Sequence, residues 1–164
     1  WPSLCQMILF LLLFIGGCTA STAGGIKVIR FSIMCELIRR GFYRRIHPRA
    51  TRAVKLGGTA ISAPLVSSVT AFITLFLGVF LVTAAVLSLQ GLDFSTTLSA
   101  SVSLLSTTGS SFGIIGNTGD YSVFCQPIRL FCSLIMIFGR VELYAALLVF
   151  VPEFWNPNRS RTVK

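Results

Sequence analysis

Acid–base and metal-binding groups are scarce in this 164-residue sequence. It contains 5 Asp and Glu residues in total and one histidine, His47, which has no nucleophile or second ligand near it. The cysteines have neither CxxC nor Cys/His ligand spacing, and we interpret them as small residues facing lipid or the core: Cys5, Cys18, Cys35, Cys125 and Cys132. An enzyme needs a nucleophile with its base, or a metal cluster. The sequence therefore predicts no enzyme, no catalytic residue and no cofactor-binding residue.

Charge is also missing from one long stretch, the 37 residues from 56 to 92. A helix needs only about 20 apolar residues to cross about 30 Å of hydrocarbon, so we expect a membrane span at 61–90. The composition agrees, because 54% of residues are hydrophobic, 12% are charged and the mean hydropathy is +0.82. Soluble domains carry about 25% charged residues. These values are typical of a membrane protein.

The basic residues are concentrated in two places. Nine of the 14 Lys and Arg residues lie between Lys27 and Lys55, three lie in the tail after residue 158, and none lies between Leu56 and Pro127. Positive charge marks cytoplasmic loops, so the linker and the C-terminus are predicted to be cytoplasmic, and Asp93 and Asp120 external. The net charge of +9 therefore indicates membrane topology and not nucleic-acid binding.

A shorter apolar segment, Phe94 to Leu105, precedes the turn TTGSSFG at 107–113. At about 1.5 Å per residue it covers only about half of the hydrocarbon thickness, so we expect it to enter the membrane and turn back. Irregular backbone at that depth is tolerated where it is buried in protein or lines water. The turn is therefore predicted to face an aqueous path, and backbone carbonyls in such turns replace the hydration shell of ions in cation channels.

The first apolar helix, predicted from about Leu4 to Ile15, is interrupted by GGCTASTAGG at 16–25. A second helix is expected from Ile26 until His47-Pro48 ends it. Discontinuous helices are typical of transport sites; the alternative is an ordinary loop at the membrane surface. Because the chain begins inside an apolar stretch without an initiator methionine, we expect a fragment of a longer protein.

Arg140 lies about midway along the last predicted span, 127–151. An arginine there costs about 2.5 to 3.5 kcal/mol on insertion scales, so we expect it to face protein or water. An ion pair with Glu142 is one alternative, although residues two apart on a helix point in different directions. Snorkelling to the interface is another.

Four motifs in order, GGCTASTAGGIKVIR, HPRATRAVKLGG, TTGSSFG and GRVELYA, resemble the C-terminal part of TrkH-type subunits of the Trk/Ktr/HKT potassium transporter superfamily. The resemblance implies an all-α membrane protein of M1–P–M2 potassium-channel-like repeats with a re-entrant pore loop. Its implied divisions are the end of the third repeat at 1–47, a cytoplasmic linker at 48–60, the complete fourth repeat at 61–151 and a cytoplasmic tail at 152–164. Within the fourth repeat, the implied elements are M1 at 61–91, the pore helix at 94–106, the filter at 107–113 and M2 at 127–151.

The resemblance also implies two sites. The ion-binding filter would consist of Thr107, Thr108, Gly109 and Ser110. The gate would pair an intramembrane loop with the arginine below the filter, and its residues would be Gly16, Gly17, Ser21, Thr22, Gly24, Gly25 and Arg140. Ser110-Ser111 stands where many relatives have Pro-Gly, a departure that bears on the carbonyl geometry.

The function implied is potassium uptake, with potassium as the transported substrate and no metal beyond potassium at the filter. The implied setting is the bacterial inner membrane, with a homodimer of full-length subunits above a cytoplasmic, nucleotide-binding TrkA-type ring and with no nucleic-acid partner. Another polytopic ion or solute permease with broken helices is the alternative. Such a permease predicts substrate-binding charges at the breaks, and GGCTASTAGG and TTGSSFG contain none.

Overall fold

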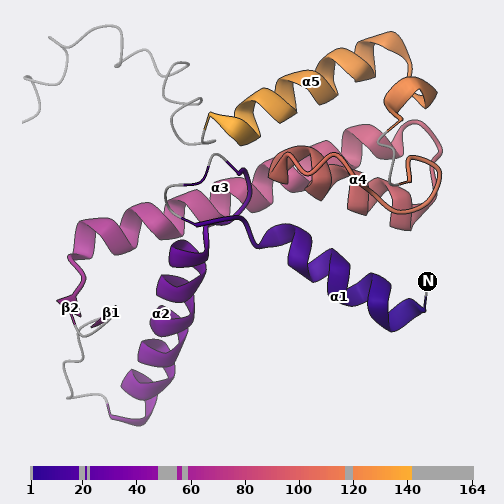
Figure 1. The fold of residues 1–164 in the computed structure, drawn as a ribbon. Helices are drawn as coiled ribbons and strands as arrows, with labels where there is room; N and C mark the ends of the chain where they lie inside the picture. The colour runs from indigo at the N-terminus through magenta and orange to yellow at the C-terminus, as the bar shows by residue number, and fades with distance from the viewer. Residues whose placement is uncertain are drawn as a thin grey trace, which may run out of the picture.

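The structure is a computed structural model that describes residues 2–18, 21, 23–47, 55–56, 59–116 and 120–141. Five α-helices account for most of the described residues (Figure 1): α1 Ser3–Phe14, α2 Val28–Ile46, α3 Ala63–Ser88, α4 Phe94–Ser106 and α5 Gln126–Arg140. A 3-10 turn, Tyr121–Val123, precedes α5, and two short strands, β1 Lys55–Leu56 and β2 Thr59–Ala60, precede α3. The fold is thus helical, as the apolar segments and the family resemblance predict.

Helix α3 is, among the described residues, the helix long and apolar enough to cross a membrane. Its 26 residues correspond to about 39 Å at 1.5 Å per residue. Hydroxyl groups along it donate to carbonyl oxygens one turn earlier, with distances of 2.9 Å for Thr70, 3.0 Å for Thr74 and 2.8 Å for Thr83. Because these polar groups are paired within the helix, they do not prevent its burial in hydrocarbon.

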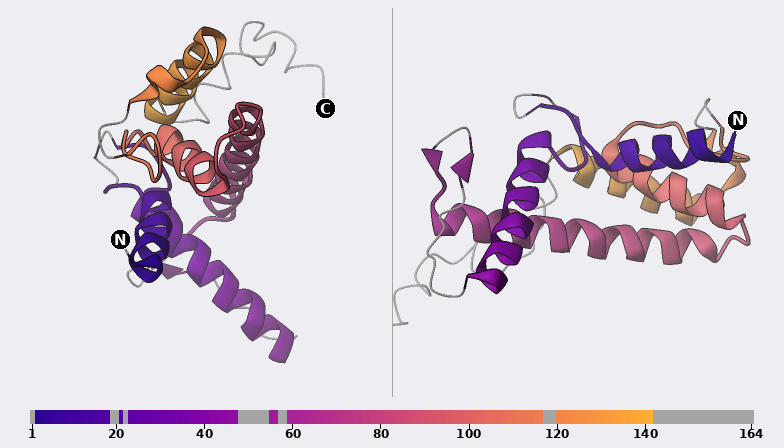
Figure 2. Two further views of the ribbon diagram at one scale, coloured as in Figure 1. Left: turned by 90° about the vertical axis from the view of Figure 1, so that its right-hand side faces the viewer. Right: turned by 90° about the horizontal axis from the view of Figure 1, so that it is seen from below.

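Helix α4 is half as long, with 13 residues, and it is the most enclosed element. It packs against α3, α5 and α1, which surround it in Figures 1 and 2. Its residues from Thr96 to Ser106, other than Leu98, are buried. The apolar core joins its leucines to aromatic side chains of α3 and of the segment before α5: Leu104, Leu105, Phe72, Phe76 and Phe124. The α4 helix is therefore fixed on several sides, and so is the segment that follows it.

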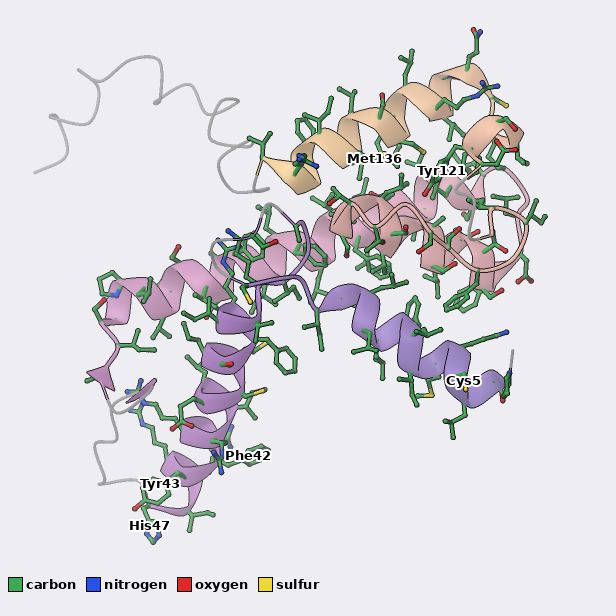
Figure 3. The ribbon with its side chains drawn as sticks, viewed as in Figure 1. Cys5, Phe42, Tyr43, His47, Tyr121 and Met136 are labelled. Carbon is green, nitrogen blue, oxygen red and sulfur yellow. The ribbon has the colours of Figure 1, made fainter. Side chains whose placement is uncertain are left out.

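Helix α2 diverges from this bundle (Figure 1). Its first turn lies on α3, where the guanidinium carbon of Arg30 is 3.9 Å from the ring centroid of Phe72, a cation–π contact. Its far end carries Phe42, Tyr43 and His47, away from α4 and α5 (Figure 3). The break between α1 and α2 thus lies beside the bundle, and α2 leaves it.

The linker contains one feature that the sequence interpretation did not include. The strands β1 and β2 form an antiparallel pair in the register Lys55↔Ala60 and Leu56↔Thr59. Gly57-Gly58 lies between them in the sequence, and two glycines are among the pairs favoured in two-residue hairpin loops. The Gly-Gly pair is a local sequence signal for such a pairing. The linker was interpreted only from its basic residues, as a guide to membrane topology.

Candidate functional site

The segment after α4 begins with an unusual backbone conformation. Thr107, the C-cap of α4, has φ 55° and ψ 32°, and it is the one non-glycine residue with positive φ among the described residues. The N–H of Thr107 donates to Leu104 O (3.3 Å), and the N–H of Thr108 donates to Ser103 O (3.1 Å). This pair of bonds is the Schellman ending of a helix, which usually has glycine at the left-handed position. The chain is thereby turned sharply away from the helix axis.

The predicted filter glycine continues this irregular path. Gly109 has φ +81°, and a Cβ added to it would meet no atom within 4 Å. Its requirement for glycine is therefore conformational and not a matter of space. The carbonyl oxygen of Gly109 accepts a hydrogen bond from the Tyr121 hydroxyl at 3.5 Å, so this carbonyl is held by the protein.

A cavity of about 330 Å³ opens along this segment. One wall consists of Leu9, Leu12 and Leu13 of α1, and the other of Thr108, Ser110, Ser111 and Phe112. Thr108 and Ser110, two of the predicted ion-binding residues, thus line a cavity with the preceding helix opposite. The Ser111 hydroxyl is buried without a hydrogen-bond partner among the described residues.

Main-chain hydrogen bonds join the two ends of the predicted gate loop. Gly16 N–H donates to Ile26 O (2.6 Å), Ile26 N–H to Phe14 O (3.0 Å) and Val28 N–H to Gly17 O (3.3 Å). These bonds hold the two ends of the interruption together, so the helix is broken by a defined loop and not by a gradual bend. Ser21 is exposed, Gly24 and Gly25 are buried, and Thr22 lies outside the described residues.

Gly24 brings this loop against the base of the filter. Its N–H donates to Thr107 Oγ1 at 3.3 Å. A Cβ at Gly24 would lie 2.8 Å from Leu105 O and 3.0 Å from Gly139 O, which is closer than side-chain contacts normally are. The loop therefore touches both the end of α4 and the end of α5, one residue before Arg140.

Arg140 is the last residue of α5, and its side chain is exposed. The gating hypothesis places a buried arginine at midspan, and this stays a prediction, because the residues that follow Val141 lie outside the described part of the chain. Gly139 makes the contact with α4, and the next position on the helix, Arg140, points in another direction. Exposure agrees with the expectation that Arg140 faces water or another part of the protein. Glu142 and the rest of the predicted span to 151 lie outside the described residues.

Two carboxylates and a phenol lie at the other end of the bundle. Asp93 is the N-cap of α4, and the Ser95 hydroxyl and N–H bond to its carboxylate, which lowers the pKa of Asp93. The Ser122 side chain and N–H lower the pKa of Asp120 in the same way. Burial raises the pKa of Tyr121, so this phenol is neutral and available as a donor. Its contact with the filter was not predicted, since nothing in the sequence relates a tyrosine 12 positions away to Gly109.

Comparison with known proteins relates these features to a family. Residues 1–157 match the protein family TrkH, described as a cation transport protein. The chain belongs to the TrkH family. It is 31% identical over 157 residues to the Trk system potassium uptake protein TrkH of Escherichia coli K12, and 33% identical to the TrkH of Vibrio parahaemolyticus. The TrkG protein of Escherichia coli K12 is 32% identical over 158 residues.

A solved structure agrees with this assignment. The crystal structure of the potassium transporter TrkH from Vibrio parahaemolyticus superimposes with a TM-score of 0.82 at 32% identity, and the match covers 95% of this chain. The chain spans about one third of its relatives, 32% of the curated sequences and 33% of the solved chain. The TrkH resemblance and the helical membrane class predicted from the sequence are confirmed. The family is one of transporters and not of enzymes, also as predicted.

Proposed function

We propose that this chain forms part of a potassium uptake system and supplies one wall of its selectivity filter. The observation that carries the proposal is the filter segment itself, where Gly109 in a left-handed conformation lies between residues that line a cavity. Desolvated potassium needs several weak oxygen ligands, because conduction requires the ion to leave as well as to enter. Thr107, Thr108 and Ser110 would supply neutral carbonyl oxygens of this kind. The relatives' names as potassium uptake proteins support the choice of ion.

The proposal includes the arrangement implied by the family. Helices α3, α4 and α5 would correspond to M1, the re-entrant pore helix and the first part of M2 of the fourth repeat, and α1 and α2 to the end of the third. The complete transporter would be a homodimer in the bacterial inner membrane above a TrkA-type nucleotide-binding ring. The 13-residue length and burial of α4 support a pore helix that does not cross the membrane.

The gate would consist of the loop at 16–25 and Arg140. The contacts of Gly24 with Thr107 and Gly139 support this proposal, because they place the loop between the filter and the residue preceding the arginine. A fixed cation in the ion path repels potassium until it moves or is screened. The loop offers backbone carbonyls as partners for that cation.

The filter is tested by Gly109→Ser in the protein expressed from its full reading frame. A side chain at φ +81° disfavours the filter backbone, by about 1 kcal/mol or more, so discrimination of potassium over sodium should fall severalfold. Gly91→Ser is a matched control, because Gly91 has φ +68° and open space around it but lies in the turn between α3 and α4. Unchanged ion ratios in Gly109→Ser, with potassium uptake intact, would remove Gly109 from the filter.

The gate is tested by Arg140→Ala and by shortening the loop at 16–25. Each change should raise potassium flux, and the combination should gain less than the sum because both changes remove one barrier. Flux is measured per folded transporter, determined by size-exclusion chromatography. Additive or unchanged fluxes would show that Arg140 does not act with the loop.

A further inference from the structure

Helix α4 carries four buried serines, an unusual number of hydroxyl groups for an enclosed helix. Ser99, Ser101 and Ser103 have no exposed surface, and Ser106 is 5% exposed. A buried hydroxyl without a hydrogen bond is costly, so the partner of each serine shows what it contributes. Ser101 Oγ donates to Thr97 O of its own helix at 2.7 Å. Ser99 and Ser103 have partners outside the helix.

Ser103 holds the start of the filter. Its hydroxyl oxygen lies 3.1 Å from Thr108 Oγ1. Its carbonyl oxygen accepts the Thr108 N–H at 3.1 Å. The Tyr121 hydroxyl donates to the carbonyl oxygen of the next residue, Gly109, at 3.5 Å. Both the backbone and the side chain of Thr108 are therefore anchored to a single residue of α4.

Ser99 holds the far end of the same segment. Its hydroxyl donates to Thr96 O at 3.1 Å and accepts the Phe112 N–H at 3.0 Å. Ser99 and Ser103 are four residues apart, so they lie on one face of the helix, one turn above the other. That face follows the filter from residue 108 to residue 112.

These two contacts determine where the filter carbonyls point. In a trans peptide the C=O of one residue points opposite to the N–H of the next, and the described residues contain no cis peptide bond. The Thr108 N–H bonds to the main-chain carbonyl of Ser103 and the Phe112 N–H to the Ser99 hydroxyl, so the carbonyls of Thr107 and Ser111 point away from α4. The Ser103 hydroxyl adds a contact to the Thr108 side chain. The Ser111 N–H is similarly taken by Gly116 O at 3.1 Å, which turns the Ser110 carbonyl away from that bond.

We propose that Ser99, through the Phe112 N–H, and Ser103, through the Thr108 hydroxyl, are positioning residues that clamp the filter from behind and so fix its carbonyls for potassium. The inference rests on the proposed function, because it assigns the clamp to the same filter. It assigns to the two serines a role in ion selectivity beyond filling the core.

The experiment compares Ser99→Ala and Ser103→Ala with Ser101→Ala in the protein expressed from its full reading frame. All three remove a fully buried hydroxyl from one helix, but only the first two remove a filter contact. Discrimination of potassium over sodium should fall about fivefold in the two clamp variants, the change expected for one lost hydrogen bond, and stay at the parental value in Ser101→Ala. Ser103→Cys, similar in size with a weaker donor, should be intermediate.

A second measurement does not require transport. Potassium bound to an intact filter should raise the melting temperature of purified protein, and this increment should shrink in the clamp variants but not in Ser101→Ala. Equal losses in all three alanine variants, or none, would overturn the clamp. If Ser103→Ala does not fold, a Ser103→Cys variant with parental selectivity would overturn it. A Gly109→Ser protein with parental selectivity would instead overturn the filter assignment itself, so the two failures are distinguishable.

Discussion

At the scale of single residues, Thr107 is the point at which helix α4 ends, the proposed filter begins and the loop at 16–25 makes contact. A β-branched residue in the left-handed region is a conformational outlier, and the conformation costs about 1 to 2 kcal/mol. Such strain persists where the surroundings over-determine it. Here the Schellman hydrogen bonds fix the backbone, and Thr107 Oγ1 accepts the Gly24 N–H. Glycine would suit the backbone better, but it would leave the loop without this acceptor.

Replacing Thr107 by glycine should therefore separate stability from gating. Thr107→Gly relieves the left-handed strain and should stabilise the fold by about 1 kcal/mol. It also removes the acceptor for Gly24, so resting potassium flux should rise. Thr107→Ser keeps the hydroxyl and should retain parental flux. Thermal unfolding and flux measured on the same preparations check both effects, and a Thr107→Gly protein with parental flux would show that this hydrogen bond does not hold the loop.

The residue scale also shows what the sequence could predict. Gly109 was assigned to the filter through the resemblance of TTGSSFG to the family motif, and its φ of +81° is a conformation that favours glycine. Tyr121 and Ser99 were not assigned to the filter, because their contacts depend on how separate segments pack. Nothing in the local pattern distinguishes Ser99 from Ser101, although only Ser99 bonds to the filter.

At the scale of elements, two glycines allow the main chains of separate elements to approach closely. A Cβ at Gly139 would collide with the carbonyl oxygen of Leu105, and one at Gly24 would lie 2.8 Å from the same oxygen. These are backbone atoms, which cannot rotate away as a flexible side chain can. The end of α4 therefore meets both the loop and the end of α5 at one point. The elements can come this close because Gly24 and Gly139 have no side chains.

Adding a methyl group at this point should push the elements apart. Gly139→Ala should destabilise the protein by about 1 to 3 kcal/mol, the usual cost of overpacking, despite the better helix propensity of alanine. Gly78→Ala in α3 is the matched control, since a Cβ there meets nothing within 4 Å; it should be neutral or stabilising by up to about 1 kcal/mol. The difference in stability is measured by the denaturation midpoints of the two variants. Equal midpoints would contradict the close approach of Gly139 to α4.

Element lengths were accessible from the sequence, and contacts between elements were not. The uncharged run predicted the long helix α3, and the apolar segment before TTGSSFG predicted the short helix α4. The surroundings of Arg140 could not be predicted in the same way, because an arginine in an apolar span indicates a special environment without indicating its nature. At this level α5 contacts α4 through Gly139, which has no side chain. A pattern of hydrophobic residues therefore does not reveal the contact.

At the scale of the whole molecule, charge separates the two ends of the bundle. The far end of α2 is basic and its exposed residues include Arg39, Arg44 and Arg45, and α3 begins shortly after the basic linker. Asp93 and Asp120 lie beyond the other end of α3, with Tyr121, which Figure 3 shows far from Tyr43 and His47. The positive-inside rule then orients the molecule.

This orientation can be tested by cysteine labelling of intact cells with a membrane-impermeant maleimide. In a background without the native cysteines, Asp120→Cys should label from outside, and Arg45→Cys should label only after permeabilisation. The reason is physical: a basic segment with nine Lys and Arg residues is retained on the cytoplasmic side during insertion. Labelling of position 120 only after permeabilisation would invert the topology and place the filter mouth on the wrong side for uptake.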